Sequence, residues 1–136
     1  MEVKFESAIK VAQANADAIY TCLADFRNLS AIIPPDKIKD WTATADTCRF
    51  SVDSIGQAGL RIADRDADKH TVKYMADGNT RFNFYLWVQT KEVAPYDSRV
   101  KVTLKAEMNP MMKMMVSGHI QKFVDMLADA IAMHRY

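Results

Sequence analysis

Three histidines, two cysteines and nine methionines are the side chains of this 136-residue chain that could most readily take part in catalysis or bind a metal or an apolar ligand. His119 follows Ser117 and Gly118, an order that matches no hydrolase motif, yet it could act as a general acid or base if it faced a cavity. A hydrogen-bonded, partly buried histidine is the alternative. Cys22 and Cys48 are too few and too widely spaced for a metal motif, so two reduced, buried thiols are expected. We therefore assign no catalytic residue, no metal site and no cofactor.

The methionines are concentrated in "NPMMKMMVSGH", residues 109–119, directly after Met108. Such a cluster could line an adaptable ligand cavity or fill a core, because methionine is flexible and polarizable. Cu(I) binding is disfavoured, since thioethers at i, i+3 spacing have only one histidine nearby. Two nearby lysines are too few for a membrane-surface helix. A dimer interface that includes exposed Tyr85 and Trp87 remains an alternative, so a homodimer is a candidate assembly.

Composition restricts the class of protein. Hydrophobic residues make up 49% of the chain, charged residues 26%, and the formal net charge is +1. This is typical of a globular protein, and the absence of a basic patch argues against nucleic acid as a partner. The N-terminal "MEVKFESAIK" is not a signal peptide, and no apolar run approaches the ~20 residues of a transmembrane helix. We expect one domain over 1–136, a cytoplasmic location and no stable membrane insertion.

The first part of the chain predicts a strand followed by two short helices. Apolar and small residues alternate with charged ones from 3 to 11, with Val3, Phe5, Ser7, Ile9 and Val11 on one face. Asn15 is a candidate helix N-cap before apolar residues at helical spacing, 19–26. A second short helix is expected in "RNLSAII", before Pro34 and Pro35, which cannot continue it.

Residues 38–108 read as an antiparallel meander of about six strands. Alternation places Phe50, Leu60 and Leu86 on inward faces, and Asp64 and Tyr74 fall in phase with those faces. Residues 77–79 have the composition of a left-handed turn. After Pro110, apolar residues recur every three or four positions to the end, which predicts one long amphipathic helix. Its stripe contains Met112, Val116, Ile120, Phe123, Leu127 and Ile131.

A sheet with one apolar face must be covered, and the C-terminal helix is the longest available element. The order of elements resembles the helix-grip fold of the START-like superfamily, also called the SRPBCC or birch-pollen-allergen superfamily. The local likeness lies in "IKVAQANADAIYTCLADFRNLSAIIP", 9–34, with Asp25, Asn28 and Pro34 at the family's structural positions. The resemblance implies an α+β fold with a curved antiparallel sheet of about seven strands wrapped around a long C-terminal helix. Two short helices follow strand 1.

The same resemblance implies an internal cavity for an apolar molecule such as a lipid, sterol or polyketide. We therefore expect a non-catalytic binding protein for a small hydrophobic or amphipathic ligand. The predicted ligand-binding residues are Phe50, Leu60, Ile62, Tyr74, Phe82, Phe84, Met112, Met115, His119 and Phe123. The alternatives are a polyketide cyclase/aromatase that uses His119, and a protein-interaction module whose groove is plugged by its own side chains.

The free-energy cost of an empty void limits how large a dry, unoccupied cavity can be. At about 24 cal/mol per Å³, a dry void of about 300 Å³ would cost roughly 7 kcal/mol. Domain stability is only about 5–15 kcal/mol. The groove is therefore expected to hold a ligand, hold water or be filled by side chains.

Overall fold

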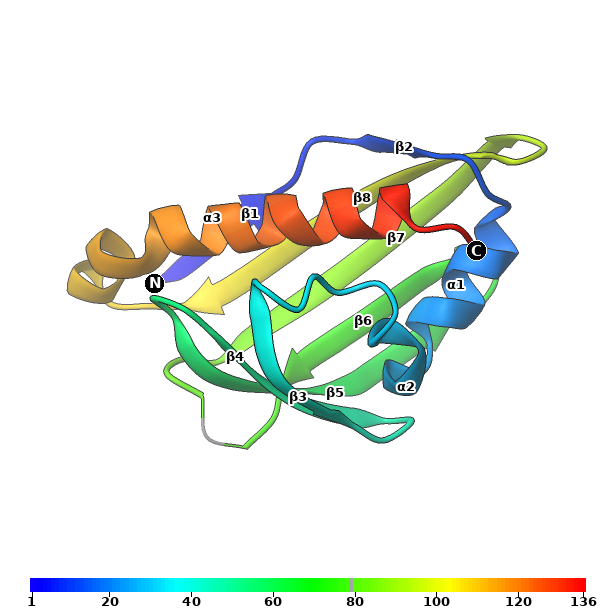
Figure 1. Cartoon of the computed structure of the whole chain (residues 1–136). Coiled ribbons are helices and arrows are strands. Elements are labelled where there is room, and N and C mark those ends of the chain that lie inside the picture. The colour runs from blue at the N-terminus through cyan, green and yellow to red at the C-terminus, as the bar shows by residue number, and fades with distance from the viewer. Residues whose placement is uncertain (79) are drawn as a thin grey trace.

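The computed structural model describes residues 1–78 and 80–136, and it contains three helices and one curved sheet (Figure 1). The elements in chain order are β1 (Glu2–Glu6), β2 (Lys10–Ala12), α1 (Ala16–Leu23), α2 (Phe26–Leu29), β3 (Ile38–Ala43), β4 (Thr47–Val52), β5 (Gly56–Asp66), β6 (Thr71–Ala76), β7 (Phe84–Ala94), β8 (Asp97–Glu107) and α3 (Pro110–Met133).

The sheet is antiparallel, with strand order β1-β8-β7-β6-β5-β4-β3, and β2 also pairs with β8. Helix α3 lies across one face of this sheet, and α1 and α2 cover one end (Figure 1). This arrangement is the predicted helix-grip fold, and the prediction of the fold is confirmed. The sheet has eight strands where about seven were expected, because the first predicted strand is divided into β1 and β2.

The division of the first strand results from one extra residue opposite β8. Glu6 pairs with Thr103 and Lys10 pairs with Val100, so three residues of the N-terminal segment face two of β8. Such a bulge reverses which side chains face the core. Ile9 and Val11 are consequently exposed, and the prediction that both lie on the buried face with residues 3–7 is wrong.

The N-terminus of α1 is stabilised by residues distant in sequence. Asn15 is the N-cap residue, as predicted, but its side chain makes no capping bond. Its Oδ1 instead accepts from the backbone N–H of Tyr96, 2.9 Å away. The Glu92 carboxylate accepts from the free N–H of Ala16 at 2.9 Å. These two bonds attach the helix to the β7–β8 hairpin.

Register shifts occur in β3, β5 and β7 of the meander, and the one in β5 reverses a predicted side-chain orientation. Ile62 pairs with Tyr74, but Asp64 pairs with Lys73. The phase shift turns the Asp64 carboxylate outward, which avoids burying an unpaired charge. The inward prediction for Asp64 is therefore wrong, whereas Tyr74 is buried as predicted. Of the predicted turn at 77–79, Gly78 has φ +71°, which suits glycine, and Asn79 lies outside the described residues.

Helix α3 begins where the sequence indicates. The Asn109 side chain accepts from the N–H of Met112 at 2.8 Å, and Pro110 occupies the first turn. The buried face includes Val116, Ile120 and Leu127 of the predicted stripe. The helix packs on β8, β1 and β2, which leaves a wider gap toward β4 and β5. No helix in the described part of the chain is long and apolar enough to cross a bilayer.

Candidate functional site

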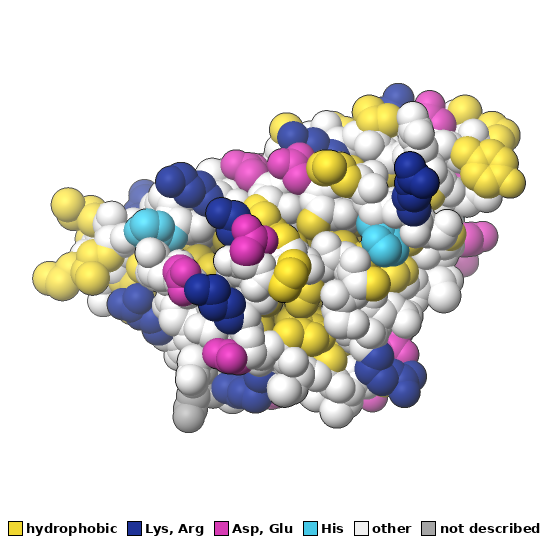
Figure 2. Space-filling view, viewed as in Figure 1, with side chains coloured by type: hydrophobic (Ala, Val, Ile, Leu, Met, Phe, Trp, Pro, Cys, Tyr) yellow, Lys and Arg dark blue, Asp and Glu magenta, His cyan; other side chains and the backbone are white. Residues whose placement is uncertain are grey.

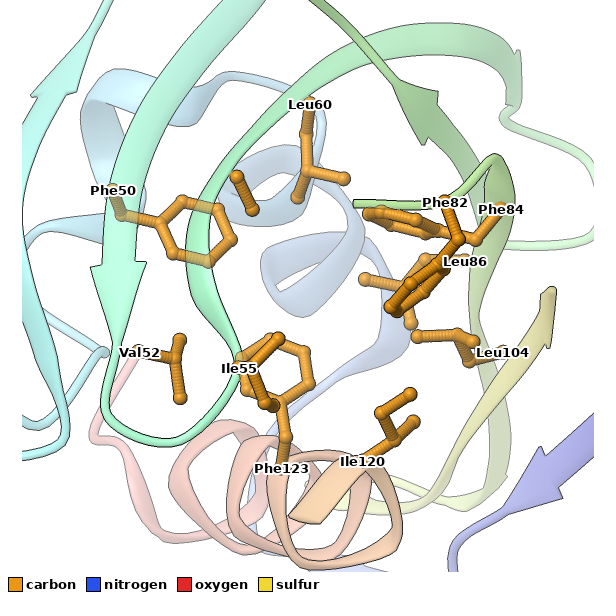
Figure 3. A pocket seen from close by; sticks show the side chains of 11 residues that line it. Phe50, Val52, Ile55, Leu60, Phe82, Phe84, Leu86, Leu104, Ile120 and Phe123 are labelled. Carbon is orange, nitrogen blue, oxygen red and sulfur yellow. The ribbon is translucent and has the colours of Figure 1, made fainter. Parts of the chain in front are cut away.

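A small apolar cavity lies in the gap between α3 and the strands β4, β5 and β7. Its volume is about 40 Å³, and the side chains around it point inward from the sheet and the helix (Figure 3). Buried residues form its inner wall, and half-buried residues form its rim. The eleven lining residues are Phe50, Val52, Ile55, Ala58, Leu60, Phe82, Phe84, Leu86, Leu104, Ile120 and Phe123.

A second apolar cavity of about 30 Å³ lies farther along the gap, toward α1 and α2. Phe50, Leu60, Leu86 and Phe123 line both cavities and therefore separate them. The rings of Phe50 and Phe123 are stacked, with centroids 6.2 Å apart and planes at 8°. Trp41 also stacks on Phe50, with ring centroids 5.8 Å apart and planes at 28°. Aromatic side chains thus fill the space that the lateral position of α3 leaves open.

Phe123 also borders a polar hollow on the outside of the molecule. This open hollow of about 380 Å³ is lined in part by Lys37, His119 and Lys122. It shares Val52 and Phe123 with the first cavity. Figure 2 shows hydrophobic side chains at the surface between α3 and the β3–β4 region, with charged groups around them. Phe123 is therefore the side chain common to the outer hollow and both inner cavities.

Five of the predicted site residues line the first cavity: Phe50, Leu60, Phe82, Phe84 and Phe123. Tyr74 lines the second cavity instead. Its hydroxyl donates to the carbonyl of Leu23 at 2.6 Å, and burial raises the Tyr74 pKa well above its ordinary value. The phenol therefore attaches β6 to the end of α1, and its proton is already engaged.

The structure does not bring the other four predicted residues into the lining of either inner cavity: Ile62, Met112, Met115 and His119. Ile62 precedes the β5 bulge, and Met112 packs half-buried against the core. Met115 is 59% exposed, and His119 is exposed in the outer hollow. The first turns of α3 project past the end of β8, where hydrophobic side chains gather (Figures 1 and 2). This projection explains why the methionine cluster is not a cavity wall.

Six residues of the lining are absent from the predicted site: Val52, Ile55, Ala58, Leu86, Leu104 and Ile120. The sequence pattern could have identified five of them, because they belong to the inward faces of predicted strands or to the apolar stripe of the helix. Ile55 lies in the turn between β4 and β5, outside any periodic pattern. No sequence signal could therefore have identified Ile55.

The environment of both cysteines disfavours the thiolate form. Burial raises the pKa of Cys48 to about 12, and Cys48 is 2% exposed. Burial, and secondarily the charge of Asp25, raises the pKa of Cys22. Within residues 1–78 and 80–136, no three His, Cys, Asp or Glu side chains are grouped in a way that could hold a metal ion.

The chain has the fold of several solved proteins but little sequence identity with them. Norcoclaurine synthase from Thalictrum flavum, in complex with a transition-state analogue, superposes with a TM-score of 0.75 and 11% identity, over 97% of this chain and 92% of that one. A START superfamily protein from Mycobacterium smegmatis gives a TM-score of 0.65 and 16% identity, over 96% and 94% of the two chains. The Zhui aromatase/cyclase from Streptomyces sp. R1128 gives 0.64 and 16%, with the same coverage.

No family model matches the chain. No curated protein matches it in sequence either. The structural likeness therefore establishes the helix-grip fold, which this chain shares with a START superfamily protein and an aromatase/cyclase.

Proposed function

We propose that this protein binds a small hydrophobic or amphipathic ligand, of lipid, sterol or polyketide kind, between the sheet and α3, without catalysis. One observation supports the proposal: the first cavity is lined by apolar residues alone and is partly open at its rim. The rim residues are half-buried, and they are Val52, Ile55, Phe82, Phe84 and Phe123. Ligand sites are typically concave and mostly apolar. Burial of the ligand would contribute about 25 cal/mol per Å² of apolar surface.

The volume of the cavity determines how a ligand must enter. About 40 Å³ is far below the roughly 300–1,000 Å³ of ordinary ligand pockets. As a void it costs only about 1 kcal/mol, which a domain tolerates. A ligand would therefore displace side chains rather than fill empty space. Movement of the Phe123 ring would join both cavities to the outer hollow, because Phe123 lines all three.

An aromatase/cyclase activity is the second candidate, because a protein of that class shares the fold. It requires an acid or base beside the substrate. His119 is the nearest histidine, but Phe123 and Val52 stand between its hollow and the first cavity. A His119→Gln variant that abolishes turnover of a polyketide while leaving its binding unchanged would support this candidate. The third alternative, an interaction module, predicts no affinity for apolar probes and a mass that depends on concentration.

The decisive experiment is native mass spectrometry of freshly purified protein, with organic extraction of the same sample. A defined extra mass released by solvent supports the proposal and identifies the ligand class. The bare chain mass, together with no calorimetric binding of decanol, would overturn it. Decanol is a suitable probe because its alkyl chain needs no polar partner inside the cavity.

A cavity-filling variant locates the site. Ala58 lines the first cavity, so Ala58→Leu should occupy the void and weaken decanol binding at least tenfold. Ala63 lies on the same strand with its side chain exposed, and Ala63→Leu is the matched control. Equal affinities for the two variants would place decanol elsewhere on the protein. Denaturant unfolding of both variants checks that each remains folded.

A further inference from the structure

Two loops contribute to the rim of the first cavity, and an arginine connects them. The β4–β5 turn contributes Ile55, and the segment before β7 contributes Phe82. Nη1 of Arg81 donates to the carbonyl oxygen of Ile55 at 3.3 Å. The stem of Arg81 also lies close to Gly56, with Cδ 3.7 Å from the position of a Cβ there. The guanidinium of Arg81 therefore lies at the rim, bonded to the backbone of the lining residue Ile55.

The guanidinium of Arg81 has no ion-pair partner among the described residues: none of their carboxylates lies within salt-bridge distance of it. The acid nearest in sequence to Ile55 is Asp53, and its carboxylate is paired with Lys39 at 3.2 Å. A guanidinium has five N–H donors in a planar fork that fits a carboxylate with two parallel bonds. A single backbone carbonyl leaves most of these donors free for another acceptor.

We propose that Arg81 binds the anionic head of an amphiphile whose alkyl part occupies the cavity, so that the preferred ligand is an acid rather than a neutral lipid. This inference rests on the proposed function, because it concerns the same cavity. The residues that line the cavity have no polar side chain that could bind the anionic head inside it, whereas the rim has the guanidinium of Arg81. The head therefore stays at the rim, and the tail points toward Leu60 and Leu86.

The unused donors of Arg81 can hold the head without any loss of the bond between the two loops. A carboxylate can accept from the donors that remain free while Arg81 keeps its bond to the carbonyl of Ile55. Hydrogen bonds to a charged acceptor are shorter and stronger than those to a neutral one, which favours an anionic head over a neutral one.

Calorimetry with decanoate and decanol tests this proposal, because the two probes share an alkyl chain and differ in the head. At neutral pH and physiological ionic strength, the wild-type protein should bind decanoate about tenfold more tightly than decanol. Arg81→Gln should remove this preference by weakening decanoate alone. Arg61 is an exposed arginine of β5, and Arg61→Gln changes net charge equally, so it should retain the preference.

The outcomes separate this inference from the function on which it rests. Equal wild-type affinities for the two probes, or a preference that survives Arg81→Gln, would overturn the role of Arg81 and leave the binding function intact. A variant that loses decanol and decanoate equally would make Arg81 a structural residue of the rim. If the wild type binds neither probe, the binding function fails, and the inference fails with it.

Discussion

Truncating Phe123 to alanine should lower the free energy of unfolding and, at the same time, raise the affinity for decanol. Phe→Ala in a fully buried core costs about 3–5 kcal/mol. Phe123 is half-buried, so we expect a loss of about 2–3 kcal/mol. For a chain of this length, that loss lowers the melting temperature by about 10 °C. The protein should therefore remain folded at room temperature.

The gain in affinity follows from the position of the Phe123 ring. On the proposed function, a ligand that enters the wild-type protein must move a ring that stacks on Phe50 and separates two cavities. Exposing a phenylalanine costs about 1.5–3 kcal/mol. The alanine variant has no ring to displace, so decanol should bind roughly tenfold more tightly or better.

Urea unfolding measures the stability, and isothermal titration with decanol measures the affinity. Phe5→Ala is the matched control: Phe5 is 5% exposed, packs in the same core and lines neither cavity. It should lose about 3–5 kcal/mol with no gain in affinity. Phe123→Leu and Phe5→Leu replace the alanine pair if either fails to fold. An unchanged affinity in the Phe123 variant, or an equal gain in both variants, would refute the idea that this ring closes the cavity.

Three further predictions follow from buried or paired polar groups. Tyr74→Phe leaves the carbonyl of Leu23 unsatisfied and should cost about 1–3 kcal/mol of stability in urea unfolding, with decanol affinity unchanged; an unaltered midpoint would contradict this. Cys48, with its pKa raised to about 12, should react with iodoacetamide at pH 8 only as fast as the chain unfolds, and rapid labelling of native protein would disprove its inert environment. Hydrogen bonds from Arg27 lower the pKa of Asp25, so this carboxylate stabilises the fold above its unfolded pKa of about 3.9, and the contribution is lost as pH falls through the folded pKa. Arg27→Gln should move the Asp25 pKa upward in an NMR titration.

Local patterns in the sequence predicted the order of the elements and the fold, although β1 and β2 were expected as one strand and α2 was expected in residues 27–33 rather than at Phe26–Leu29. Alternation along the strands and three-to-four spacing in the last helix are properties of neighbouring residues, so they are readable without coordinates. Asn109 and Pro110 mark the start of α3 for the same local reason. Their order along the chain then leaves one long helix to cover one apolar sheet face.

Strand pairing decided the details that alternation could not. One extra residue before β2 exposes Ile9, and the bulge after Ile62 turns Asp64 outward. A bulge depends on which residue lies across the ladder, and the partner strand is distant in sequence. Asn15 illustrates the same dependence, since its side chain bonds to Tyr96 rather than to its own helix.

The residues of the candidate site were determined partly by local sequence patterns and partly by tertiary packing. Periodicity identified Phe50, Leu60 and Phe123 as inward residues, and they line the cavity. Composition pointed equally to Met115, which is exposed because α3 extends past the sheet. The lateral position of a helix on a sheet is set by the packing of many side chains together, and no local pattern encodes it. That position decides which aromatic rings fill the gap and how small the cavity is.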